Sequence, residues 1–239
     1  MKVNPLKAAL AEGRPQIGTW INLVRNPAIL TLLQGAGLDY ARVDMEHSSP
    51  SIETVADMAL LSRALDFPLI VRPPEGSREW ITRLLDVGVW GLHVPQVDTP
   101  EIAQRVAEAA RYAPEGMRGM AVNGPQNDFT PSVPLANLND QVHVTIMLES
   151  VEAFSHLDEI AATPGIDAVT LGPSDLAQEL GVLGTPDEGK VIDEHRDLLI
   201  DAARRAGKDV AMLLGTVEQA ARWIEAGVKL VALGSDVAV

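Results

Sequence analysis

Short apolar runs alternate along the whole chain with longer amphipathic stretches. The runs are rich in valine, isoleucine and leucine, which favours buried strands, and the stretches between them repeat apolar residues at helical spacing. The predicted strands are residues 17–21, 40–44, 68–72, 91–95, 142–148, 167–172, 209–214 and 229–234. The predicted helices include residues 51–66, 77–88, 99–113, 193–207 and 216–227, several opened by serine or threonine and closed by glycine. Eight strands alternating with helices predict an α/β fold, a (β/α)8 TIM barrel.

Two segments depart from this alternation. Residues 116–140 are too long and too rich in proline, glycine and asparagine for an ordinary connection, and we expect a lid or an oligomer contact there. The sequence also ends at LGSDVAV without a helix after the eighth strand, so the barrel apparently lacks its last helix in this chain. That gap predicts an apolar flank, covered by a partner or by residues outside this sequence.

Composition bounds the chemistry. A chain of 239 residues with 46% hydrophobic residues predicts one domain over residues 1–239. Because cysteine is absent, disulfides, thiolate nucleophiles and cysteine-ligated metals are excluded. A formal net charge of -14 argues against nucleic-acid binding. No run of ~18 apolar residues and no apolar export segment occur, so we expect a cytoplasmic protein without a membrane partner.

Polar residues follow several predicted strands, at the end of a barrel where active sites form. The second strand runs into Asp44, Glu46 and His47, the third ends at Arg72, and the fifth is followed by Glu149. The sixth leads into GPSD, which contains Asp175, and the eighth ends in Ser235 and Asp236.

Each of these residues has a catalytic and a structural interpretation. Glu149 and Asp175 follow adjacent strands and are hard oxygen ligands suited to Mg²⁺ or Mn²⁺, although a lone carboxylate there is as often a helix cap. Arg72 is suited to hold a carboxylate or enolate oxygen, or else to pair with Asp44 or Glu46 and seal the barrel mouth. His47 is suited to proton transfer. The other histidines, 93, 143, 156 and 195, are interpreted as packing or surface residues.

The lysines discriminate between mechanisms. Lys208 and Lys229 begin strands, at the wrong end of the barrel, and Lys2, Lys7 and Lys190 lie in the tail or a loop. No lysine is placed for a Schiff base, so carbanion chemistry here would need a metal as the electron sink.

With these residues assembled, the chain resembles the metal-dependent 4-hydroxy-2-oxoheptanedioate aldolases of the HpcH/HpaI family, which share a superfamily with the citrate lyase β subunit. The resemblance covers nearly the whole chain. Its motifs are DMEHS (44–48), VRPP (71–74), RLLDVGVWGLHVPQV (83–97), RYAPEGMRG (111–119), LES (148–150) and GPSDLA (172–177).

The resemblance implies a class II aldolase that cleaves a 4-hydroxy-2-oxo acid to pyruvate, or a related 2-oxo acid, and an aldehyde. It implies a divalent metal (Mg²⁺, Mn²⁺ or Co²⁺) on Glu149 and Asp175, with Arg72 stabilising the enolate and His47 in proton transfer. Asp44 and Asp86 match acidic positions near that histidine, with Asp86 reaching it from a neighbouring subunit of a homo-oligomer, a hexamer by resemblance. The implied substrate-binding residues are Trp20, Arg72, Gly172, Pro173, Ser174 and Asp175.

Two departures from the family pattern bear on the substrate. Met147 stands where the dioate aldolases usually carry glutamine, and AVNGPQNDF (121–129) replaces their arginine-containing loop. Two alternatives stay open: an acyl-CoA lyase of the citrate and malyl-CoA lyase group, and a non-catalytic binding barrel. Turnover of malyl-CoA would favour the first, and tight 2-oxo-acid binding without proton exchange the second.

Overall fold

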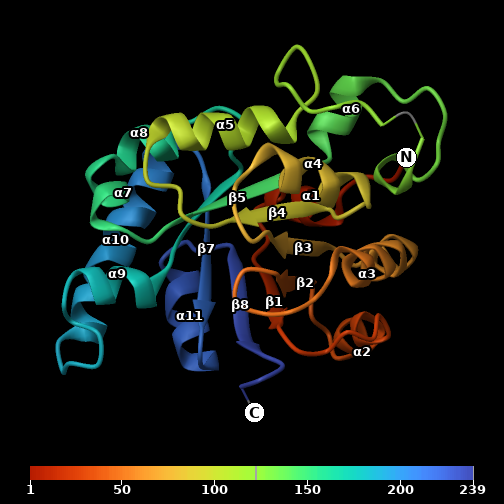
Figure 1. Ribbon diagram of the computed structural model, residues 1–239. Helices are drawn as coiled ribbons and strands as arrows, with labels where there is room; N and C mark the ends of the chain where they lie inside the picture. Colours follow the sequence, from red (N-terminus) through yellow and green to blue (C-terminus); the bar gives the residue numbers. More distant parts are fainter. Residues whose placement is uncertain (122, 239) are drawn as a thin grey trace.

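The strands close into a barrel in a computed structural model that describes residues 1–121 and 123–238. Each strand pairs in parallel with its neighbours in chain order, and the eighth pairs with the first. All eight predicted strands are confirmed, with ends shifted by a residue or so, and the barrel stands in the centre of Figure 1. The strands are β1 Gln16–Ile21, β2 Tyr40–Asp44, β3 Leu69–Arg72, β4 Gly91–Val94, β5 His143–Leu148, β6 Ala168–Leu171, β7 Asp209–Leu214 and β8 Leu230–Ser235.

Helices surround the barrel, and the five predicted ones are confirmed. Serine and threonine hydroxyls cap several of them, as at Ser51, whose Oγ accepts from Thr54 N at 3.3 Å. The last long helix before β7 begins at Glu188, earlier than predicted, so Lys190 lies in a helix rather than a loop. The helices are α1 Pro5–Ala11, α2 Ile29–Gly35, α3 Ile52–Leu65, α4 Arg78–Asp86, α5 Pro100–Ala110, η1 Pro125–Asn127, α6 Leu135–Asp140, α7 Val151–Ser155, α8 Leu157–Ala161, α9 Pro173–Glu179, α10 Glu188–Ala206 and α11 Val217–Glu225.

The segment after β8 and the apolar character of the helices complete the description of the fold. After β8 the described residues run to 238 without a further helix. Among the described residues, none of the helices combines the length and apolar character needed to cross a membrane.

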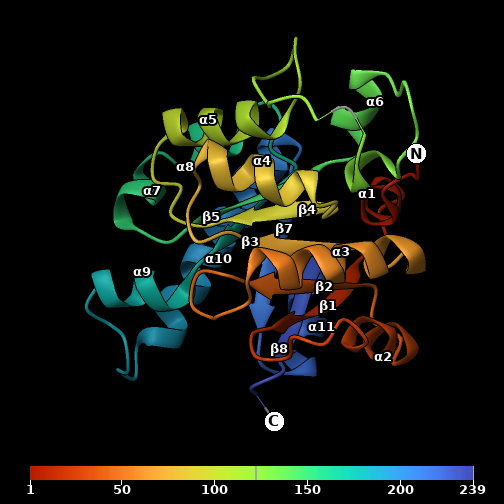
Figure 2. The same cartoon turned by 45° about the vertical axis from the view of Figure 1, so that its right-hand side comes forward.

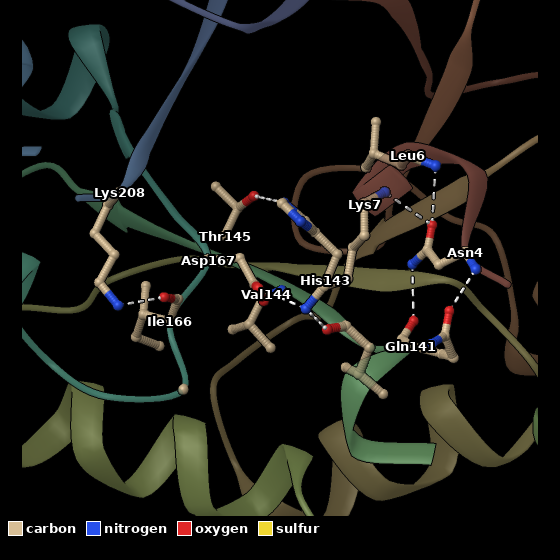
Figure 3. Close-up of polar contacts among 12 residues, drawn as sticks. Asn4, Leu6, Lys7, Gln141, His143, Val144, Thr145, Ile166, Asp167 and Lys208 are labelled. Atoms are coloured by element: carbon tan, nitrogen blue, oxygen red, sulfur yellow. Dashed lines mark hydrogen bonds and ion pairs between the residues drawn. The ribbon is translucent and has the colours of Figure 1, made fainter. Parts of the chain in front are cut away.

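The N-terminal helix α1 closes the end of the barrel where the strands begin. Its Leu6 and Leu10 pack against a separate apolar cluster inside the barrel, made by Tyr40, Ile70, Ala168, Ala211 and Leu230. Asn4 caps this helix by accepting from Leu6 N at 3.1 Å, and its amide donates to the Gln141 carbonyl at 2.8 Å (Figure 3). The same amide donates to the Trp90 carbonyl at 3.0 Å. The barrel is therefore packed shut at this end, which leaves the opposite end for a pocket.

A charged cluster lies at the same closed end, around Asp167. Its carboxylate accepts from Lys7 Nζ at 2.7 Å, Arg111 Nη2 at 3.3 Å and Val144 N at 2.8 Å. Lys208 is nearby and donates to the Ile166 carbonyl at 2.7 Å (Figure 3). Lys208 and Lys229 lie at the strand starts, as predicted, at the wrong end for Schiff-base chemistry. Lys7 lies in α1 rather than in a tail or loop, and it too is at the closed end.

The long segment 116–140 also packs toward the closed end. Asp128 accepts from Arg63 Nη1 at 3.0 Å and from Lys2 N at 2.5 Å, and the Met1 amino group donates to Thr130 at 3.0 Å. In both views α6 lies beside the N-terminus, away from the carboxyl ends of the strands (Figures 1 and 2). The predicted lid is therefore wrong for the described residues of this segment, from which residue 122 is excluded, while the oligomer contact stays a prediction.

His143 makes the fold sensitive to acid. It lies at the start of β5, 1% exposed, and its Nε2 lies 3.0 Å from Thr145 Oγ1. Burial lowers the pKa of His143 to about 4, from 6.5 for an ordinary histidine, although the charge of Asp167 acts the other way. Because the pKa of His143 is lower in the folded protein than in the unfolded chain, its burial does not reduce the free energy of unfolding above pH ~6.5. As the pH falls toward the folded pKa, protonation of the unfolded chain lowers that free energy. We expect a loss of ~3 kcal/mol of unfolding free energy by pH ~4.

Urea unfolding followed by circular dichroism between pH ~7 and ~4 measures this loss. His143→Gln removes one titrating ring and should reduce the slope over that range, while His93, which is also buried with a lowered pKa, still contributes to it. His156→Gln, between α7 and α8, is the matched control and should keep the slope of the unchanged protein. Equal slopes in all three proteins would contradict the prediction.

Candidate active site

A pocket of ≈ 430 Å³ opens at the carboxyl ends of the strands. Residues from β1, β2, β3, β4, β5, β6, β7 and β8 or the loops that follow them contribute to its walls. Most of the predicted site residues lie together here, on loops and strand ends far apart in the sequence. Those that line it are Trp20, His47, Arg72, Glu149, Gly172, Pro173, Ser174 and Asp175.

Arg72 is fixed in the pocket wall by Asp44. Its Nε and Nη2 donate to the two carboxylate oxygens of Asp44 at 2.8 and 2.7 Å, a bidentate pair, and its guanidinium lies 4.8 Å from the Trp20 ring centre. Asp44 is fully buried, which by itself raises the pKa of this carboxyl. The hydrogen bonds and charge of Arg72 outweigh burial and lower the pKa of Asp44 below its ordinary value. The interpretation of Arg72 as an ion-pair partner of Asp44 is confirmed. Arg72 also lines the pocket, and its role toward a substrate oxygen stays a prediction.

Glu46 joins Arg72 to His47 at the mouth. Its carboxylate lies 3.1 Å from Arg72 Nη1 and 3.6 Å from His47 Nε2. The Glu46 side chain is 9% exposed and that of His47 is 62% exposed, so the histidine reaches solvent while its partner does not. Burial raises the pKa of Glu46, and the positive charge of Arg72 opposes this shift. The predicted pairing of Glu46 with Arg72 is therefore confirmed, and its place between Arg72 and His47 makes Glu46 part of the mouth of the site.

Glu149 is held at the pocket by its neighbours on two strands. Its Oε1 accepts from Gln96 N at 2.7 Å, and Gln96 turns its amide inward with a positive φ of 55°. A side chain on Gly172 would meet Glu149 Cβ at 2.7 Å and Met147 Sδ at 3.0 Å, so this approach requires glycine. Glu149 Oε2 accepts no hydrogen bond from the described residues, and that oxygen is left for a ligand.

The electrostatics of Glu149 favour a cation. Burial raises the pKa of Glu149 to about 7, and the nearby negative charges of Glu46 and Asp175 act in the same direction, against the hydrogen bond from Gln96. A carboxylate that is buried beside other carboxylates gains most from a bound positive ion. Glu149 and Asp175 therefore fit a hard divalent cation.

The donor set is small. Over residues 1–121 and 123–238, no three histidine, cysteine, aspartate or glutamate side chains are grouped to ligate one ion. Two carboxylates with the other positions open to water or substrate suit Mg²⁺ and Mn²⁺. Asp175 lies in the first turn of α9, after Gly172 and Pro173, and the first-turn amides of a helix have no partners within it. The amides of Ser174 and Asp175 are therefore available to a carboxylate.

Two predicted site residues, Asp44 and Asp86, do not line the pocket. Asp44 pairs with Arg72, whereas Asp86 pairs with none of the described residues that line the pocket. It ends α4 and accepts from Arg118 Nη2 at 2.6 Å. Its predicted contact with His47 of a neighbouring subunit concerns an assembly, and both that contact and the hexamer stay predictions.

Sequence reasoning missed several pocket residues, including three polar ones that lie within strands. Arg42, His93 and Thr170 lie in strand interiors, yet all three line the pocket. His93 is buried and packs against Trp20, as its interpretation as a packing residue requires, but it also lines the pocket. A strand in a barrel has one face toward the interior, and an apolar pattern does not say which. Arg42 offered a signal, since an arginine amid the buried run YARVD has to meet something polar.

Comparison with known proteins agrees with this geometry. A family model described as HpcH/HpaI aldolase/citrate lyase matches residues 16–239. A hydroxypyruvate/pyruvate aldolase of Deinococcus radiodurans is 37% identical over 247 residues, covering 99% of this chain and 87% of that protein. A 5-keto-4-deoxy-D-glucarate aldolase of Escherichia coli is 36% identical over 240 residues, covering 99% and 92%.

A solved structure gives the same answer for the fold. The crystal structure of an HpcH/HpaI aldolase from Desulfitobacterium hafniense superimposes with a TM-score of 0.91 at 31% identity, over 98% of this chain and 91% of that one. These relatives are named as aldolases, so they support a carbon–carbon lyase. The chain belongs to the HpcH/HpaI aldolase/citrate lyase family.

Proposed function

We propose that this protein is a divalent-metal-dependent class II aldolase that reversibly cleaves a 4-hydroxy-2-oxo acid. The products are pyruvate, or a related 2-oxo acid, and an aldehyde. The observation that carries the proposal is the shared pocket of Glu149, Asp175 and Arg72, two hard ligands beside a fixed cation. The names of the relatives, a hydroxypyruvate/pyruvate aldolase and a 5-keto-4-deoxy-D-glucarate aldolase, support the same reaction class.

The residues divide the work of a retro-aldol cleavage. The reaction breaks the bond between C3 and C4, and the electron pair left on C3 must be delocalised into the C2 keto oxygen. A bound Mg²⁺, Mn²⁺ or Co²⁺, held by Glu149 and Asp175, would act as a Lewis acid toward that oxygen. Arg72 supplies a second positive charge, and its pairing with Asp44 fixes the guanidinium so that little reorganisation is needed during the reaction.

A proton must also move, from the C4 hydroxyl during cleavage. His47 and Glu46 lie together at the mouth of the pocket, where the His47 side chain is exposed and the Glu46 side chain is largely buried beside Arg72. We assign the proton transfer to His47, through a water, with Glu46 beside it. None of the five lysines lines the pocket, which leaves no iminium route among the described residues.

Proton exchange of pyruvate tests the proposal without knowledge of the aldehyde. Incubation with pyruvate and Mg²⁺ in D₂O should remove the methyl proton signal in NMR spectra faster than in a protein-free sample, because the pocket stabilises the enolate. Excess EDTA should return the rate to that of the protein-free sample. The absence of exchange with Mg²⁺, Mn²⁺ and Co²⁺ alike would contradict an aldolase acting on pyruvate.

A further inference from the structure

A layer of side chains below the catalytic residues is polar where a barrel interior is ordinarily apolar. In a (β/α)8 barrel, alternate strands contribute four inward side chains to each layer, most of them branched and apolar. Side chains alternate along each strand, so the inward set on β2 that begins with Tyr40 continues with Arg42 and Asp44. By the same alternation the layer of Arg42 contains His93 from β4, Thr170 from β6 and Ala232 from β8.

Arg42 is buried in this layer without a partner. It is 1% exposed, and none of its three guanidinium nitrogens donates a hydrogen bond to the described residues. Its contacts are aromatic, with the Trp20 and Tyr40 ring centres 5.7 and 5.4 Å from its Cζ. Asp44, the next inward residue on β2, has both oxygens committed to Arg72. A buried charge left unpaired is costly, so this guanidinium requires an anion.

His93 has the same deficit. It is 1% exposed, neither ring nitrogen has a hydrogen-bond partner among the described residues, and its ring meets the Trp20 ring edge-on at 5.2 Å. Burial, with the charges of Arg42 and Arg72, lowers the pKa of His93 well below its usual value, so the ring is neutral and offers one donor. Arg42 and His93 both line the pocket that holds Glu149, so a ligand in the pocket lies beside these two side chains, whose unpartnered nitrogens have almost no surface exposed to solvent.

We infer that Arg42, His93 and Thr170 form a carboxylate-binding subsite at the floor of the pocket. The planar guanidinium fork matches the two oxygens of a carboxylate, and one negative charge balances the one uncompensated positive charge of this layer. A phosphate would bring more negative charge than the layer can neutralise. The ligand class is a small carboxylic acid that reaches the floor with one carboxylate, while Glu149 and Asp175 at the mouth face the rest of the molecule.

This subsite goes beyond the proposed function because it requires neither metal nor turnover. Its probe is formate, the smallest carboxylate, titrated into protein in EDTA and followed through the arginine Nε–H and histidine ring signals in ¹H–¹⁵N NMR spectra. We expect a saturable shift of the Arg42 and His93 signals. Arg42→Met should weaken formate binding at least tenfold, read from the His93 signals, and Arg42→Lys should weaken it less.

Matched variants separate this subsite from the catalytic one. Glu149→Gln should keep formate binding, because the floor does not use that carboxylate, so a failure of the aldolase proposal leaves this result unaffected. Arg42→Met should fold and should have a higher Tm than the unchanged protein without formate, since it replaces an unpaired buried charge with an apolar group. Three results would each overturn the carboxylate subsite. They are formate binding that Arg42→Met leaves unchanged, no shift of the Arg42 or His93 signals in any of the proteins, and chloride that produces the same signal shifts as formate at the same concentration.

Discussion

Glu149→Gln is expected to abolish metal binding and, with it, metal-dependent proton exchange of pyruvate. The substitution keeps the size of the side chain and an oxygen that can accept from Gln96 N, but removes the negative charge that a divalent cation needs. Loss of outer-shell partners of a metal already costs ~10–100-fold in affinity, so loss of one of two ligands should cost at least ~100-fold. Calorimetric titration with Mn²⁺ and the exchange rate in D₂O are the two measurements.

Glu152→Gln is the matched control for this variant. Glu152 follows the same strand three residues later, is exposed in the first turn of α7 and does not line the pocket. It should retain both Mn²⁺ affinity and exchange. Full activity in Glu149→Gln would mean that the metal, if the reaction needs one, is held elsewhere, and the assignment of this pair of carboxylates would fail.

The barrel itself was predictable because burial leaves a strong mark on the sequence. Strands of a parallel barrel are covered by helices outside and filled inside, so they appear as continuous apolar runs such as residues 69–71 and 146–148. The residues placed directly after these runs, Arg72 and Glu149, were predictable for the same reason. In a parallel barrel all the strands end on one side, which brings these side chains together whatever their distance in the chain.

Positions inside the strands were not predictable in this way. His93 lies within an apolar run, and nothing in the run says that its side chain faces a cavity rather than packed helices. Gln96 donates its backbone N–H to Glu149 and has a positive φ, and nothing in the sequence predicts that conformation for a glutamine. Likewise, residues 116–140 were correctly identified as irregular, but their position depends on contacts with Lys2 and Arg63 that lie far away in the chain.

Arg72→Met is expected to reduce both stability and catalysis, because Arg72 neutralises a carboxylate that water does not reach. Asp44 is 0% exposed and its two oxygens are paired with Arg72, so the substitution would leave a buried charge without its partner. Removing one partner of a buried pair costs ~3–5 kcal/mol, and we expect a loss of that size in urea unfolding at pH ~7. Metal-dependent exchange should also fall, by at least ~100-fold, since a donor to the developing enolate oxygen is worth ~3 kcal/mol or more.

A double variant separates the two roles of Arg72. Asp44→Asn removes the buried charge, so Arg72→Met combined with Asp44→Asn should recover most of the lost stability and none of the lost exchange. Arg83→Met, an exposed arginine on α4 that contacts Trp80, is the matched control and should change neither quantity substantially. If the double variant regained exchange along with stability, Arg72 would serve only to hold Asp44 in place. If Arg72→Met lost exchange while Asp44→Asn alone kept most of it, the guanidinium itself would be the group that acts on the substrate.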